Sequence, residues 1–115
     1  MTHVKVIEKQ GLSVFEHLPF LCWIKRNQIY VYGNQAINEF AGENVVGKKD
    51  AELIWGSNAT MLLEAGTQAI GAGEAQYLHE TVDHSKRGKV TLSVCKFPVE
   101  FEGEICAMGI SFIIE

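Results

Sequence analysis

The 115-residue sequence has few cysteines and no long apolar run, and each shortage excludes a class of protein. Three cysteines are an odd and low number, which argues against a disulfide framework and is typical of a reducing compartment. No segment approaches the roughly 20 apolar residues that a membrane-spanning helix needs. The first residues form no apolar secretory segment either. We therefore expect a cytoplasmic protein with no membrane contact from this segment.

Positive charge is also scarce. Ten Lys and Arg residues against fourteen Asp and Glu residues give a net charge of −4. Because nucleic-acid binding uses clustered positive charge against phosphates, this balance predicts no nucleic-acid partner. The hydrophobic fraction of 47% and the charged fraction of 21% are those of an ordinary globular domain. No repeat or Pro/Ser-rich linker divides the chain, so we expect a single domain over residues 1–115.

The first third of the sequence reads as a lead-in followed by two strands. Residues 1–19 comprise the lead-in and a helix at about 10–17, which Pro19 stops. Residues 20–25 and 29–32 have the aromatic and β-branched composition of strands. The short polar break between them predicts an antiparallel hairpin.

The middle third has helical spacing. Asn34 is placed to cap a short helix that Gly42 ends. Asp50 is expected to cap a second short helix, and Asn58 a longer one from 59 to about 70.

The last third changes to a period of two and contains three further strands, at 77–83, 89–97 and 105–114. Strands at both ends and helices between them indicate an α+β domain with an antiparallel sheet. We expect a five-stranded antiparallel sheet, with its core over 20–114 and short helices packed on one face.

Short pieces in a fixed order carry a family resemblance. They are Leu18-Pro19 before Trp23-Ile24-Lys25, Tyr32-Gly33-Asn34-Gln35-Ala36, Gly42, Val46-Gly47-Lys48-Lys49-Asp50-Ala51-Glu52-Leu53, Glu80, Gly88, Lys96-Phe97-Pro98-Val99, Glu102-Gly103-Glu104-Ile105 and Met108-Gly109-Ile110-Ser111. In this order and spacing the chain resembles a PAS domain from about residue 12 to 114. It departs from the family at Arg26, where an aspartate is usual, and in its last four residues, which replace an Asp-Ile-Thr linker.

The resemblance implies a sensory and protein-interaction module with strand order 2-1-5-4-3. PAS domains hold small ligands or cofactors between sheet and helices and act on an attached output domain. Because the chain stops where family linkers begin, we expect a bacterial sensory module excised from a larger signalling protein, such as the histidine kinase of a two-component system. The alternatives are a module of a transcriptional regulator or diguanylate cyclase, a free-standing module, a ligand-free dimerisation module and, less favoured, a small cavity enzyme.

The sequence offers little for catalysis, haem or flavin. No nucleophile, histidine and carboxylate set is apparent, so we expect the domain itself not to be an enzyme. In the family, the axial haem ligand comes from the helical segment, and the flavin-binding cysteine from an Asn-Cys-Arg-Phe-Leu-Gln helix. All the histidines and cysteines lie outside the helices of the middle third: His3, His17, His79, His84, Cys22, Cys95 and Cys106. We therefore expect neither cofactor, and no metal ion.

Alternation along the first strand sends Cys22 and Ile24 to one face and Trp23 to the other. We expect Cys22 and Ile24 to face the helices, although a one-residue slip in register would turn Cys22 outward. As the resemblance implies, a ligand pocket would lie between sheet and helices, lined by Cys22, Ile24, Ile37, Phe40, Leu53 and Met61. So apolar a lining favours a small, largely neutral organic ligand.

Glu80 is a polar candidate for the same pocket, since it lies between Leu78 and Val82 on one face of a strand. If that face is buried, Glu80 needs a partner such as Lys96, because a lone buried carboxylate is costly. It would then anchor a ligand or form a signalling salt bridge. If the face is exposed, the two residues form an ordinary ladder pair, and both interpretations stay open.

The last strand is apolar on both of its faces. A sheet with two apolar faces needs a second cover. We therefore expect a homodimer that forms through the helix at 10–17 and the outer face of the sheet.

Overall fold

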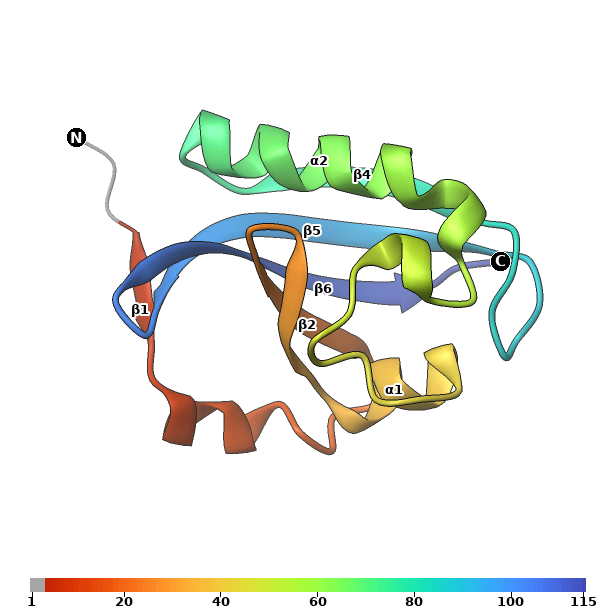
Figure 1. Cartoon of the computed structure of the whole chain (residues 1–115), viewed down its shortest axis with the longest axis horizontal. Coiled ribbons are helices and arrows are strands. Elements are labelled where there is room, and N and C mark those ends of the chain that lie inside the picture. The colour runs from red at the N-terminus through yellow and green to blue at the C-terminus, as the bar shows by residue number, and fades with distance from the viewer. Residues whose placement is uncertain (1–3) are drawn as a thin grey trace.

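The computed structural model describes residues 4–115, so His3 and the start of the lead-in lie outside it. One mixed sheet dominates the fold (Figure 1). Its strands are β1 (Lys5–Ile7), β2 (Leu21–Arg26), β3 (Ile29–Gly33), β4 (Gln76–Val82), β5 (Val90–Phe101) and β6 (Glu104–Ile113). The α-helices are α1 (Gln35–Ala41) and α2 (Ala59–Ala72), and the 3-10 helices are η1 (Lys9–Val14), η2 (Asp50–Glu52) and η3 (Gly56–Asn58).

The five expected strands occur in the expected order. The path β3-β2-β6-β5-β4 is the order 2-1-5-4-3 when strands are counted from β2, and all its pairings are antiparallel. β2 pairs with β6 from Leu21↔Ser111 to Lys25↔Ala107. The β2–β3 hairpin turns at Asn27 and Gln28, which have positive φ values of 50° and 71°.

A sixth strand corrects the expected five-stranded, purely antiparallel sheet. β1 pairs in parallel with Val99–Phe101 of β5. β4 pairs only with Val90–Lys96, so the later part of β5 has a free edge that β1 occupies. The sheet is therefore mixed and six-stranded, because three residues of the lead-in extend beside this edge.

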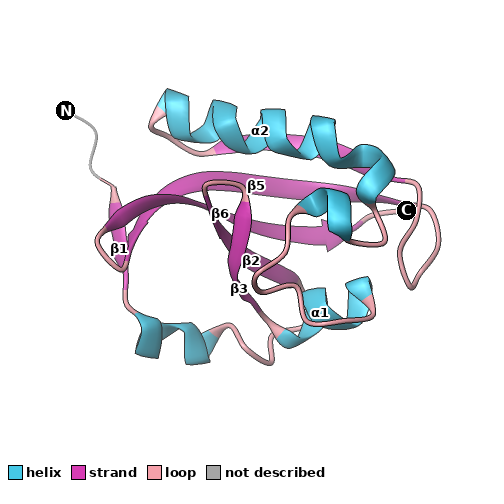
Figure 2. Cartoon of the chain, in the orientation of Figure 1, coloured by secondary structure: helices cyan, strands magenta, loops and turns pink. Residues whose placement is uncertain are grey.

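Two hydrophobic clusters lie on opposite faces of the sheet. One cluster joins Trp23 of β2 to α1 and α2 residues such as Ile37 and Leu62. The other joins Ile24 to Leu12 of η1. Figure 2 shows α2 running along β5 and β6, with η1 far from it. The N-terminal segment thus covers one face and the two α-helices cover the other.

The helix expected at 10–17 is only a 3-10 helix over Lys9–Val14. Gly11 and Val14 are weak helix formers, which explains the short turn in physical terms. Leu12 is nevertheless buried against the outer face of the sheet, as a covering residue should be.

Of the two asparagines expected to cap the α-helices, Asn34 caps α1 and Asn58 does not cap α2. Asn34 Oδ1 accepts a hydrogen bond from the Ile37 amide at 3.1 Å, and Gly42 ends α1 with a φ of 77°. Asn58 does not cap α2, because its Oδ1 instead accepts a hydrogen bond from the Asp83 amide at 3.0 Å. Asn58 therefore ties the start of α2 to the end of β4.

Candidate functional site

The helix-covered face of the sheet encloses a cavity of about 30 Å³. That volume has room for about two water molecules. Aromatic and aliphatic side chains form much of the lining, but five lining residues are polar: Lys25, Tyr30, Glu80, Lys96 and Ser111. Several polar groups therefore lie within a lining that is otherwise aromatic and aliphatic.

Lys96 and Glu80 form one buried ion pair at this cavity. Lys96 Nζ lies 2.8 Å from Glu80 Oε2, and each side chain is only 2% exposed. Lys96 Nζ also donates to the Leu62 carbonyl of α2 at 3.4 Å. The pair thus connects the sheet to the helix that covers it, and of the two interpretations of Glu80 the buried one is correct.

Lys25 and Asp50 form a second buried ion pair, with Lys25 Nζ 2.8 Å from Asp50 Oδ2. Asp50 Oδ1 accepts hydrogen bonds from the Tyr30 hydroxyl at 2.7 Å and from Trp55 Nε1 at 2.9 Å. The Lys25 ammonium also lies 5.2 Å from the centre of the Tyr30 ring, within cation–π range. Asp50, expected to cap a short helix, is instead held by three side-chain donors.

Burial and pairing act against each other on the pKa values of these groups. Burial raises the pKa of Asp50, but Lys25 and the aromatic donors outweigh it and hold this pKa below its ordinary value. Burial lowers the pKa of Lys96, and Glu80 offsets only part of that effect. Burial, reinforced by Asp50, raises the pKa of Tyr30 well above its usual range, so its hydroxyl stays a donor.

Ser111 of β6 has the one buried side-chain oxygen or nitrogen without a hydrogen-bond partner among residues 4–115. The residue is fully buried and lies in the wall of the cavity. An unpaired buried hydroxyl costs free energy, so it marks a place where a further polar partner would be favourable.

Four residues expected to line the pocket, Cys22, Ile24, Leu53 and Met61, are absent from its lining. Cys22 and Ile24 belong to the cluster under η1, on the face away from α1 and α2. The inward residues of β2 are its odd-numbered ones, because Leu21, Trp23 and Lys25 line the cavity. Since Cys22 is buried among apolar groups, desolvation raises the pKa of its thiol to about 12.

Met61 is also misplaced by the sequence pattern. Its side chain is 38% exposed on α2, whereas the neighbouring Leu62 lines the cavity. Ile37 and Phe40 of α1 and Glu80 of β4 do line the cavity, as expected for a pocket in this place. Leu53 lies in the same cluster but away from the cavity lining.

The ligand was expected from an apolar lining, and the structure adds polar side chains beside the apolar ones. Lys25, Asp50, Tyr30 and Trp55 were not among the residues expected at the pocket. Lys25 carried a usable signal, since it shares a strand face with Trp23 and a lysine there must find a partner. Asp50 carried none, because only the fold brings it next to β2.

Two kinds of feature are absent from residues 4–115: a metal-ligating cluster and a membrane-spanning helix. Residues 4–115 contain no group of three or more His, Cys, Asp or Glu side chains arranged to hold a metal ion. None of the helices in this part of the chain has the length and apolar character needed to cross a membrane.

Among known proteins, only solved structures share a recognisable similarity with this chain. No family model matches the sequence, and no curated protein does. VqmA bound to DPO aligns with a TM-score of 0.78 and 21% identity over 91% of this chain and 57% of its own. The Vibrio cholerae VqmA dimer without target DNA aligns at 0.78 with 18% identity over 95% of this chain and 53% of its own. The PAS domain of nitrogen regulation protein NR(II) from Vibrio parahaemolyticus aligns at 0.69 with 13% identity, over 89% of this chain and 95% of that domain.

The chain has a PAS fold. It spans 57% and 53% of the two VqmA chains, whereas it matches nearly the whole NR(II) domain. In this PAS fold, the cavity and both buried ion pairs lie between the sheet and the helical segment that follows the first hairpin.

Proposed function

We propose that this chain is a sensory PAS module that binds a small polar organic molecule in the cavity between the sheet and helices α1 and α2. The observation that carries the proposal is the convergence of two buried ion pairs and an unpaired hydroxyl on one cavity. Replacing buried ion pairs by apolar side chains is often neutral or stabilising. A core that served packing alone would gain nothing from this arrangement.

The hydrogen-bonding capacity at the cavity indicates the class of ligand. A lysine ammonium has three donor positions. Lys96 uses two of them, on Glu80 and the Leu62 carbonyl, and Lys25 uses one, on Asp50. Ser111 uses none. Spare donors and aromatic walls favour a small, planar, neutral molecule that carries hydrogen-bond acceptors.

The fold comparison supports this function. The VqmA structure described as bound to DPO shares the fold over 91% of this chain. That protein is described in complex with DPO, and we carry over a ligand-binding sensory role and leave the identity of the ligand open. The cavity of about 30 Å³ must widen to accept an organic ligand.

The test uses the only two tryptophans of the chain, Trp23 and Trp55, because both line the cavity. A library of small heteroaromatic compounds is screened for a rise in melting temperature together with a change in tryptophan fluorescence. Phe40→Trp fills the cavity and should abolish both responses for any hit. Ile24→Val, on the opposite face, is the control and should retain them. If no compound stabilises the wild-type protein, the ligand-free dimerisation module becomes the preferred function.

Homodimerisation through the outer face is a second part of the proposal. Tyr77, Cys95, Ile110 and Cys22 are aligned by register across four neighbouring strands on that face. η1 covers the Cys22 end, whereas Tyr77 at the other end is 80% exposed. A partly covered apolar face of this kind fits a second copy of the chain. The VqmA structure described as a dimer is consistent with this.

Light scattering tests the dimer. Tyr77→Lys should convert a dimer to a monomer, and the substitution should leave the fold intact because the side chain is exposed. Ile70→Lys places the same charge on an exposed apolar position of α2, on the other face of the sheet, and should leave the dimer unchanged. A monomeric wild-type protein at high micromolar concentration contradicts this part of the proposal.

The output of the module is a further proposal. We expect the domain to regulate an attached output domain in a bacterial signalling protein, either a transcriptional regulator or a histidine kinase. The matches to VqmA, whose structure is described with reference to target DNA, and to a nitrogen regulation protein support one class each. Fusing the domain to each output type and measuring ligand-dependent activity would distinguish the two.

A further inference from the structure

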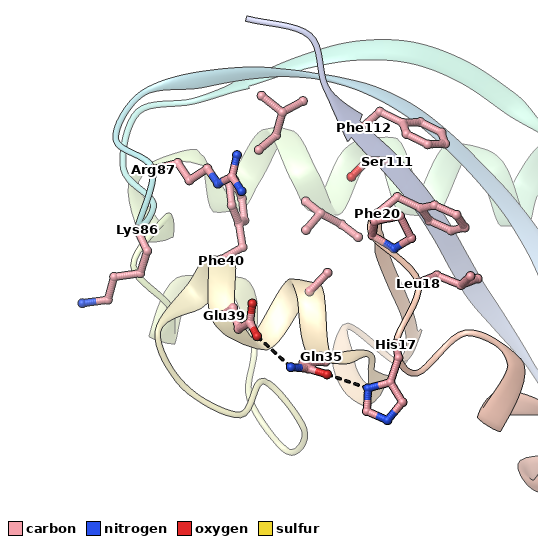
Figure 3. Close-up of a pocket in the computed structure, with 14 residues that line it drawn as sticks. His17, Leu18, Phe20, Gln35, Glu39, Phe40, Lys86, Arg87, Ser111 and Phe112 are labelled. Carbon is pink, nitrogen blue, oxygen red and sulfur yellow. Dashed lines mark hydrogen bonds between the residues drawn. The ribbon is translucent and has the colours of Figure 1, made fainter.

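A groove of about 680 Å³ opens near the end of β6. Its walls come from residues 17–21, from α1, from the turn between β4 and β5, and from β6 itself (Figure 3). Leu21, Phe40 and Ser111 line both this groove and the interior cavity, so a single layer of side chains separates the two spaces. We propose that the groove is a second binding site, which takes a small organic anion with an aromatic body, such as an aryl carboxylate.

Arg87 supplies the charge that selects an anion. Figure 3 shows its side chain turned into the groove, whereas the neighbouring Lys86 is directed away. Within residues 4–115, the Arg87 guanidinium takes part in no ion pair and no side-chain hydrogen bond. Its planar fork of donors matches the two oxygens of a carboxylate.

Glu39 is the one acidic residue in the groove lining, and it is already engaged. Its Oε1 accepts a hydrogen bond from Gln35 Nε2 at 2.9 Å. The Gln35 carbonyl oxygen in turn lies 2.5 Å from His17 Nδ1, which donates to it. This row of hydrogen bonds follows the α1 side of the groove and leaves the Arg87 side for the anion (Figure 3).

The apolar part of the ligand is indicated by the opposite wall. The rings of Phe20 and Phe112 are in contact there, with centroids 5.1 Å apart and planes tilted by 47°. Phe112 is 53% exposed, so its ring is available for stacking. An inorganic anion would leave this wall unused, which is why we assign an aromatic body to the ligand.

Ser111, which borders the interior cavity as well, is a second polar group at the groove. Its buried hydroxyl has no partner and lies at the back of the groove (Figure 3). Phe40 and Leu21 line both spaces together with Ser111. The groove thus offers a cation, an aromatic wall and an unused donor.

The experiment is an NMR titration of the isotope-labelled chain with benzoate. Benzyl alcohol keeps the ring without the charge, and inorganic phosphate keeps charge without the ring. Benzoate should shift the amide signals of Phe20, Ala36 and Phe112 with a saturating curve. Both control compounds should bind at least about tenfold more weakly, as expected when a charged hydrogen bond or the ring contact is lost.

Three variants identify the groups involved. Arg87→Gln should weaken benzoate binding about tenfold. Lys86→Gln removes an equal charge from the adjacent residue and should weaken benzoate binding by less than about twofold. Ser111→Ala should weaken binding by about threefold without lowering the melting temperature, because it removes an unsatisfied hydroxyl from the free protein. A merely structural Ser111 would leave benzoate affinity unchanged.

Several results overturn the proposal. They are the absence of any benzoate-induced shift at millimolar concentration, equal effects of Arg87→Gln and Lys86→Gln, or phosphate binding as tight as benzoate. Lys96→Met separates this site from the interior cavity. If that substitution abolishes benzoate binding and benzoate shifts the indole signals of Trp23 and Trp55, the anion occupies the cavity and the groove is not its site. Failure here leaves the sensory function untouched.

Discussion

Lys96 and Glu80 form their ion pair without lying opposite each other in the sheet. Lys96 of β5 is paired in register with Gln76, and Glu80 of β4 with Leu92. The two side chains must therefore extend along the inner face, past the Leu78–Val94 pair, to meet at 2.8 Å. A cross-strand ladder pair would need no such reach. Both charged residues line the cavity.

Breaking this pair on one side should be costly. Glu80→Leu or Lys96→Met alone should lower the free energy of unfolding by about 3–5 kcal/mol, because each leaves a buried charge unpaired. The double variant should be more stable than either single variant, since no lone charge remains. Urea denaturation of the four proteins measures this coupling. Losses that simply add would show that the two charges do not depend on each other.

Asp50 should make stability depend on acid pH. Its folded pKa is lower than its unfolded value of about 3.9. The stability that it contributes is therefore fully present above about pH 5 and is lost as pH falls through the folded pKa. Asp50→Asn should be less stable at pH 7 and should lose less stability on acidification than the wild-type protein.

Two glycines should respond to alanine with opposite signs. A Cβ at Gly109 of β6 would meet the Trp23 ring at 2.2 Å, so Gly109→Ala should destabilise the protein by about 1–3 kcal/mol. The displaced indole should also change its fluorescence. A Cβ at Gly66 of α2 meets nothing within 4 Å, so Gly66→Ala should stabilise the helix by about 0.5–1 kcal/mol. Thermal and urea unfolding of both variants check the signs.

The three thiols should differ in reactivity. Cys22 and Cys106 are buried, and burial raises the pKa of both. Cys95 is partly exposed on the outer face. In the Tyr77→Lys monomer at pH 8, a disulfide reagent should therefore modify Cys95 quickly and the other two thiols only at the rate of unfolding, whereas the proposed dimer should slow the reaction of Cys95. Cys95→Ser should remove the fast phase, and a fast phase that persists would contradict this assignment.

Alternation and turn residues act locally, so the sequence pattern predicts the strands well, whereas the strand order was expected from the resemblance to PAS domains. The weak point of the pattern is which face of a strand is buried. Both faces of β2 are apolar, so the pattern alone does not distinguish Cys22 and Ile24 from Leu21 and Trp23. A choice of the wrong face moves every β2 residue of the site to the opposite side of the sheet.

The polar half of the site illustrates a different limit. Glu80 and Lys96 were accessible to inference, since both interrupt apolar strand faces and each needs a partner. Asp50 was not, because its partners Lys25, Tyr30 and Trp55 come from separate segments that meet only after folding. α2 shows the same difficulty: Gly66 is buried where the more hydrophobic Met61 and Ile70 are exposed.

The short parallel strand β1 has a consequence for solubility. β5 is longer than β4, and without β1 the backbone of Val99–Phe101 would present unpaired amide and carbonyl groups at an open edge. Such edges recruit strands from other molecules. Pro98, which has no amide hydrogen to offer, stands at the junction between the stretch that β4 protects and the stretch that β1 protects. Residues 5–7 thus protect this edge from edge-to-edge aggregation. A chain shortened to begin at β2 should keep the cavity but aggregate more readily.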